Sequence, residues 1–229
     1  MYIGLMVISA VFTGIGMYLS GQLKKKFAKY SRMPVASGLS GAEIAEKMLR
    51  DNGILNVKVT QGQGMLTDHY NPGTKTVSLS PDVYNGRHVA AAAVAAHECG
   101  HAVQHATSYS MLQLRSALVP IVSFSAKIQQ YIFMLGMVMM GVMGGKLFLM
   151  IAIAVFGATT LFSLVTLPVE FDASNRALAW LDKSGIAVGR EHDGAKDALK
   201  WAALTYVSAA LAALVQLLYL VSILMGRRD

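Results

Sequence analysis

His97-Glu98-Cys99-Gly100-His101 is the stretch around which this chain of 229 residues is organised. Alanine-rich residues 90–96 precede it, and residues 87–107 are predicted to form one helix. Side chains four positions apart on a helix lie on one face, one turn from each other, so two imidazoles can reach the same ion. Glu98 lies about 100° from His97 and about 60° from His101 around the axis. All three side chains therefore share one sector of a helix whose small residues allow close packing.

The chemistry of this HExxH pattern is that of a zinc peptidase. Glu98 stands beside the open zinc position, where a carboxylate can take a proton from water and later give it to the leaving amine. Cys99 is about 200° from His97, so it is predicted to be a small core residue and not a ligand. His88, more than two turns before His97, is interpreted as a surface histidine.

A peptidase zinc site needs a third protein ligand. His105 lies one turn beyond His101, but about 12 Å from His97 along the axis. His105 is therefore interpreted as a residue that supports a ligand or faces the substrate. The alternative interpretation is a surface histidine without a role in the site. The longer pattern with a third histidine fails at Gln104 and Thr107. Glu170 is the other candidate; its alternative role is a helix-start glutamate favoured by the helix dipole.

The composition indicates a membrane protein. The chain is 54% hydrophobic and 14% charged, and its mean hydropathy is +0.47. Four apolar runs are long enough to span a bilayer: about 2–19, 117–143, 147–167 and 202–225. Lys127 is expected to snorkel to the membrane surface, and Pro168 is expected to end the third span.

The charges indicate the orientation. The net charge of +7 lies mainly between the apolar runs, which places residues 20–116 and 168–200 in the cytoplasm. Basic residues follow the first run and none precedes it, as in an uncleaved anchor and unlike a signal peptide. Arg227 and Arg228 oppose this orientation. No basic stripe with interleaved aromatic residues indicates nucleic-acid binding, and the single cysteine excludes an internal disulfide.

The predicted fold is that of a mainly α membrane protein with about four transmembrane helices and a zincin-like cytoplasmic α+β catalytic part. Its predicted segments are an anchor (1–20), a first catalytic part (21–116), a transmembrane hairpin (117–167), a second catalytic part (168–200) and a last transmembrane helix (201–229). In the first catalytic part, a helix is predicted over 42–52 and strands over 56–60, 65–70 and 76–79, the last as an edge strand for an extended peptide. Asn71-Pro72-Gly73 predicts the turn of a hairpin.

Three segments resemble one family. The zinc-binding pattern, the downstream Glu170-x-x-Ala173-Ser174 and the segment Asp68-His69-Tyr70-Asn71-Pro72 are similar to the YugP-type neutral zinc metallopeptidases. More distantly, the chain is similar to the HtpX and CAAX prenyl protease group. The resemblance implies that Glu170 is the third zinc ligand. The distant group usually has Asp at the position of Ser174.

Further residues are candidates for supporting roles. Asp172 and Ser174 are predicted to orient a ligating histidine. His69, Tyr70 and Arg176 are candidates to stabilise the oxyanion of a tetrahedral intermediate.

The main hypothesis is an endopeptidase at the cytoplasmic face of the cell membrane with one Zn²⁺ per chain. Its expected partners are a protein or peptide substrate, membrane proteins among them, the lipid bilayer, and a second copy or an accessory membrane protein; nucleic acid is not expected. One alternative is a non-catalytic membrane scaffold with structural zinc, which would need a fourth protein ligand. The other is an intramembrane protease of the site-2 type with Asp193 as a ligand, but residues 89–96 are too short to span a bilayer.

Overall fold

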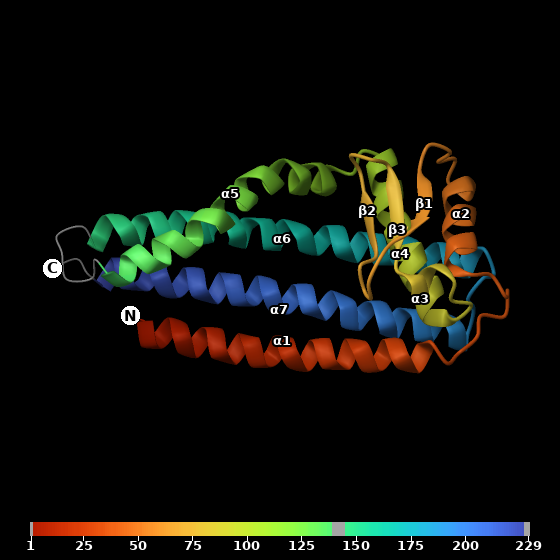
Figure 1. Cartoon of the computed structure of the whole chain (residues 1–229), viewed down its shortest axis with the longest axis horizontal. Coiled ribbons are helices and arrows are strands. Elements are labelled where there is room, and N and C mark those ends of the chain that lie inside the picture. The colour runs from red at the N-terminus through yellow and green to blue at the C-terminus, as the bar shows by residue number, and fades with distance from the viewer. Residues whose placement is uncertain (1, 139–144, 227–229) are drawn as a thin grey trace. The chain divides into compact units, whose positions relative to one another are not determined.

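The computed structural model describes residues 2–138 and 145–226 and divides the chain into two units. Unit 1 comprises residues 1–18, 113–167 and 205–229, and unit 2 comprises residues 19–112 and 168–204. Figure 1 shows the long helices α1 (Tyr2–Tyr30), α5 (Ser110–Val138), α6 (Gly145–Lys183) and α7 (Arg190–Gly226). The three shorter helices of the described residues and the three strands belong to unit 2.

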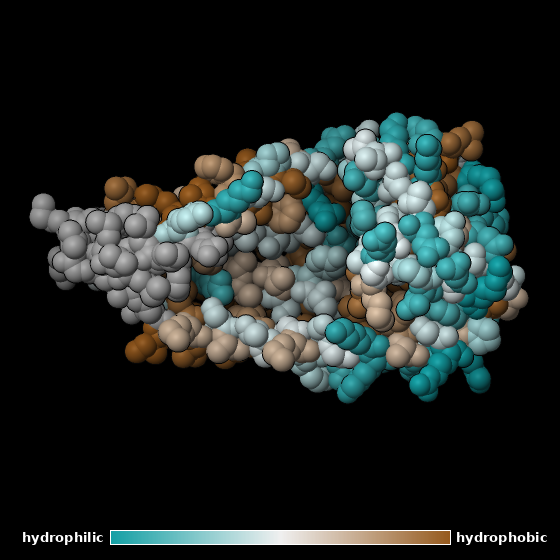
Figure 2. Space-filling model, in the orientation of Figure 1, coloured by the Kyte–Doolittle hydropathy of each residue, from teal (hydrophilic) through white to brown (hydrophobic). Residues whose placement is uncertain are grey.

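Unit 1 is built from apolar helices whose outer side chains are exposed. Large hydrophobic side chains such as Ile3, Phe124 and Leu218 are between 58% and 79% exposed, and Figure 2 shows hydrophobic residues along these helices. Within the unit, the Thr160 hydroxyl lies 3.2 Å from the carbonyl oxygen of Ala213, which joins α6 to α7. Apolar side chains facing outward are expected where the solvent is lipid.

Among the described residues, three helices are long and apolar enough to cross a membrane: Ile3–Tyr30, Leu149–Lys183 and Arg190–Gly226. The expected second span, 117–143, is covered by α5 as far as Val138, and its last part lies outside the described residues. The structure thus supports three of the four expected spans by length and composition.

Pro168 was expected to end the third span, but the helix itself does not end there, because α6 continues through the proline to Lys183. Proline inside a helix costs about 3 kcal/mol by removing a donor and crowding the preceding turn. Packing outweighs this cost. Four residues one turn apart beyond the proline, namely Val169, Ala173, Ala177 and Leu181, are completely buried.

The sheet of unit 2 has three strands in the order β1-β3-β2. β1 (Lys58–Gln61) runs parallel to β3 (Thr76–Leu79), and β2 (His69–Asn71) runs antiparallel to it. The predicted hairpin turn is present, with the Asn71 side chain accepting hydrogen bonds from the backbone of Gly73 and Thr74. The expectation that residues 76–79 form an edge strand is wrong: β3 is central because β1 pairs with its other side.

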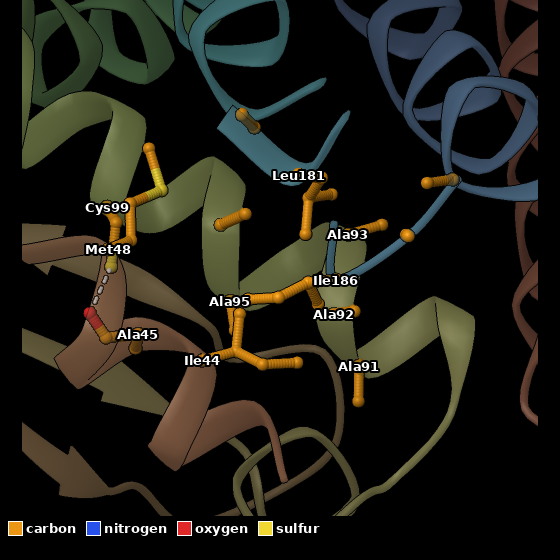
Figure 3. Packing of buried hydrophobic residues seen from close by; sticks show 14 of the residues in the cluster. Ile44, Ala45, Met48, Ala91, Ala92, Ala93, Ala95, Cys99, Leu181 and Ile186 are labelled. Carbon is orange, nitrogen blue, oxygen red and sulfur yellow. Dashed lines mark hydrogen bonds between the residues drawn. The ribbon is translucent and has the colours of Figure 1, made fainter. Parts of the chain in front are cut away.

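Helix α4 (Val89–Ala106) is the buried centre of unit 2 and packs against α2 (Gly41–Asp51), α3 (Pro81–Tyr84) and the sheet. His88 is not a plain surface residue: its Nδ1 accepts a hydrogen bond from the Ala91 backbone and caps the helix. Alanines of α4 belong to one buried hydrophobic cluster with Ile44, Leu181 and Ile186, and Figure 3 shows these side chains packed together. The Cys99 thiol donates to the carbonyl oxygen of Ala45 and is completely buried, so it is a core residue, as expected.

Candidate metal centre

The two histidines of α4 meet a glutamate of α6, entirely within unit 2. The Glu170 Oε2 atom lies 3.3 Å from Nε2 of His97 and 3.6 Å from Nε2 of His101. The two imidazole rings are edge to face, with centroids 4.8 Å apart. Glu170 is 3% exposed. A carboxylate this deeply buried needs partners for its charge, and the two imidazoles face it.

The second ring nitrogen of each imidazole, Nδ1, faces a polar side chain, which is a different one for each histidine. Nδ1 of His97 lies 3.1 Å from the Ser174 hydroxyl. Nδ1 of His101 lies 3.0 Å from Oε1 of Gln104. An amide oxygen can only accept, so Nδ1 of His101 carries a proton. In the neutral ring, Nε2 then holds the lone pair with which His101 could bind a metal ion, and in the charged ring Nε2 donates to Glu170.

Charges around His101 control its protonation. Burial by itself lowers the pKa of this imidazole, but its bond to Glu170 and the negative charges of Glu98 and Glu170 outweigh burial, so the pKa is raised. Glu98 is 8% exposed and close enough to His101 for its charge to act on it. The site therefore holds two carboxylates in a region with little water.

A glycine sets the distance between α4 and α6. A Cβ atom on Gly100 would lie 2.5 Å from the carbonyl oxygen of Ala173 and 3.1 Å from its Cα. No side chain fits there without moving backbone. Gly100 lies next to the candidate ligand His101, so this close approach brings the candidate ligands of the two helices within reach of each other.

The donor set fits a zinc ion. The ligand atoms of His97, His101 and Glu170 all lie within 4.8 Å of one another. In a tetrahedral site with bonds near 2.1 Å, the ligand atoms are about 3.4 Å apart, close to the two distances from Glu170. Two imidazoles and one carboxylate are a donor set of catalytic zinc, which leaves a fourth position open. Across residues 2–138 and 145–226, this is the group of side chains able to hold a metal ion that the structure brings together.

Two other predicted residues, Tyr70 of β2 and His105 of α4, contact each other and are not part of the group of His97, His101 and Glu170. Nδ1 of His105 lies 2.7 Å from the Tyr70 hydroxyl, and both rings are in contact. Burial raises the pKa of Tyr70, so its hydroxyl keeps its proton at neutral pH. The pair couples β2 to the face of α4 that carries the ligands.

The other predicted residues are also outside the group of His97, His101 and Glu170. His69 is exposed on β2, and its Nδ1 contacts the carbonyl oxygen of Thr67. Asp172 contacts no histidine directly; it accepts hydrogen bonds from Gln104 and from Nε of Arg176. Asp193 is exposed in the first turn of α7 and is not part of the ligand group.

Gln104 was not among the predicted site residues; in the sequence it stands out only as a break in a longer histidine pattern. The available signal was a polar residue three positions after a candidate ligand in a helix otherwise rich in alanine. Residues three apart on a helix are neighbours, so the amide could have been assigned to His101.

Three helices long and apolar enough to cross a membrane, together with a partly buried His97 grouped with the buried His101 and Glu170, indicate a membrane protein with a candidate peptidase-like metal site. The family comparison agrees. Residues 5–225 match the model of a family described as "putative neutral zinc metallopeptidase", and the chain belongs to this family. It is 41% identical over 216 residues to the "Putative membrane protease YugP" of Bacillus subtilis (strain 168), covering 94% of each chain. No solved structure matches the chain.

Proposed function

We propose that this chain is a membrane-embedded, zinc-dependent endopeptidase in which Glu98 is the general base. The observation that carries the proposal is the meeting of His97 and His101 with Glu170, with the buried Glu98 next to them on the same helix. The family and its membrane-protease relative support the same reaction class.

The proposed reaction is hydrolysis of a peptide bond by water. A zinc ion bound by His97, His101 and Glu170 would polarise the scissile carbonyl and lower the pKa of a water molecule. The Glu98 carboxylate takes the proton of the attacking water and passes it to the nitrogen of the leaving amine. Ser174 and Gln104 keep the Nε2 atoms of the histidines directed at Glu170.

Several groups are candidates to stabilise the oxyanion. Tyr70 is favoured because its hydroxyl retains a proton and is held by His105 next to the ligand-bearing face. Arg176 forms an ion pair with Asp172 and lies 5.9 Å from the ring centre of Tyr109. His69 contacts the carbonyl oxygen of Thr67, just before its own strand. Both residues are therefore less favoured than Tyr70.

The proposed location is the cytoplasmic face of the cell membrane, with the protein crossing the bilayer several times. The basic residues at the C-terminal end of α1 and directly after it, among them the exposed Lys24, Lys25 and Arg32, support this orientation. The proposed partners are the lipid bilayer, a protein or peptide substrate such as a membrane protein, and a second copy or an accessory membrane protein. Nucleic acid is not proposed as a partner.

The two alternative functions have less support. A structural zinc site would have four protein ligands, whereas the group in the described part of the chain has three. A site-2-type intramembrane protease would use Asp193, which lies outside that group.

The test compares three variants of the full chain purified in detergent: Glu98→Gln, Glu170→Ala and the control Glu46→Gln, an exposed residue of α2. We expect Glu98→Gln to keep zinc and lose cleavage of a generic unfolded protein, Glu170→Ala to lose both, and Glu46→Gln to keep both. Zinc content is measured by atomic emission and cleavage by release of fluorescent peptides. Proteolysis that survives Glu98→Gln would overturn the catalytic assignment.

A further inference from the structure

Gln104 is a buried polar residue that uses its whole amide. Its side chain is completely buried. Oε1 faces Nδ1 of His101 at 3.0 Å, and Nε2 donates to the carbonyl oxygen of Val169 and to Oδ2 of Asp172, both at 2.8 Å. A primary amide has two N–H donors, and both are in use.

These three bonds fix the orientation of the amide. If the amide were flipped, its oxygen would face two acceptors and its nitrogen would face the His101 ring. The observed orientation therefore selects the tautomer of His101 that has its proton on Nδ1. The lone pair on Nε2 of His101 is then available on the side of Glu170.

The same amide also positions the other half of the ligand set. Val169 precedes Glu170 directly, and Asp172 follows it by two positions, so Gln104 holds α6 on both sides of the carboxylate. One side chain of α4 thus controls the orientation of an imidazole and the position of a carboxylate from another helix.

We infer that Gln104 is the positioning residue of the metal centre, orienting His101 and fixing Glu170 against it through one amide. This inference rests on the proposed zinc site but not on peptidase activity. A neutral amide suits this role because Glu98, Glu170 and Asp172 already bring negative charge to the region. A carboxylate at position 104 would lose both donors and turn an oxygen toward two acceptors, Val169 and Asp172.

The experiment measures zinc affinity of the metal-free full chain in detergent by competition with a chromophoric chelator. The variants are Gln104→Leu, Gln104→Glu and the control Leu181→Ala, which removes a completely buried side chain of α6 that is not bonded to a ligand. Losing a group that holds a metal ligand typically lowers metal affinity by about 10–100-fold. We expect a loss of this size in both Gln104 variants.

The control separates positioning from general destabilisation. Leu181→Ala should lower the melting temperature at least as much as Gln104→Leu and leave zinc affinity close to that of the unsubstituted chain. A second readout is the visible absorption of bound Co²⁺, which reports ligand geometry: its bands should shift in the Gln104 variants only.

The outcomes are distinct. If the unsubstituted chain binds zinc and Gln104→Leu binds it equally well, or loses no more affinity than Leu181→Ala, the positioning role is refuted while the proposed function stands. If the unsubstituted chain binds no zinc, the proposed function itself fails, and the role of Gln104 fails with it.

Discussion

Replacing Gly100 by alanine should move α4 and α6 apart and so separate the proposed zinc ligands. The added Cβ would lie 2.5 Å from the carbonyl oxygen of Ala173. Ordinary contacts between carbon and a carbonyl oxygen lie at about 3.3–3.6 Å, so α4 and α6 have to separate by about 1 Å. The obstacle is backbone, which no change of rotamer can relieve.

This displacement is large for a metal site but small for the fold. Metal–ligand distances tolerate about 0.2 Å, so a shift of about 1 Å between the histidines and Glu170 should lower zinc affinity at least as much as losing a supporting group, about 10–100-fold. Overpacking costs about 1–3 kcal/mol, partly offset by the gain of up to about 1 kcal/mol for alanine over glycine in a helix. The melting temperature should therefore fall little compared with zinc affinity.

Gly21→Ala is the matched control. Gly21 lies inside α1, and a Cβ there would meet no atom within 4 Å. Zinc affinity, measured by chelator competition, should be unchanged in this variant, and the melting temperature should stay the same or rise. If Gly100→Ala bound zinc as tightly as the unsubstituted chain, the close approach at Ala173 would not set the geometry of the ligands.

Three further perturbations test the same site and its surroundings. Removing zinc with a chelator should destabilise the protein by about 2.7 kcal/mol when free zinc had been at 100 times its dissociation constant; Glu170→Ala should unfold at the same temperature with and without chelator, and a response in that variant would contradict the ligand assignment. In the metal-free protein, the raised pKa of His101 means that its pairing with Glu170 contributes stability below the unfolded pKa of histidine, and this contribution is lost as pH rises through the folded pKa. Zinc affinity should rise with pH, because protons compete with zinc for the imidazole. A melting temperature of the metal-free protein that also rises over this pH range would contradict the pairing of His101 with Glu170. Asp68→Ala removes the acceptor of the Ser80 backbone N–H and hydroxyl and should cost about 1–3 kcal/mol; a chemical denaturation curve measures this, and zinc affinity should stay the same.

The parts of the site that depend on helix period could be predicted from the sequence. His97, Glu98 and His101 share a sector because of the 3.6-residue repeat, and Cys99 is turned into the core for the same reason. The hairpin turn at Asn71 was likewise predictable because the turn-forming residues are adjacent in the sequence.

The parts that depend on packing between distant segments could not be predicted in this way. Glu170 was suggested by a family resemblance, since nothing in its local pattern distinguishes a ligand from a helix-start glutamate. Pro168 carried a local signal for a helix end, which the buried stripe of Val169 and Ala173 overrides. The parallel pairing of β1 with β3 joins segments that are not consecutive in the chain, so the central place of β3 was missed.

The contacts between α4 and α6 indicate that helix register, more than any single ligand, determines the metal centre. Along four contacts, the residue numbers rise in α4 and fall in α6: His97 with Ser174, Gly100 with Ala173, His101 with Glu170, and Gln104 with Val169. The two helices are therefore antiparallel along the site. A slip of one turn would move Glu170 by about 5.4 Å, too far for it to share an ion with both histidines. It would also place another α4 residue against the Ala173 backbone, where Gly100 alone now fits, and would leave the donors of Gln104 without the Val169 carbonyl. The residues that bind no metal thus select the one register in which the three that can bind it meet.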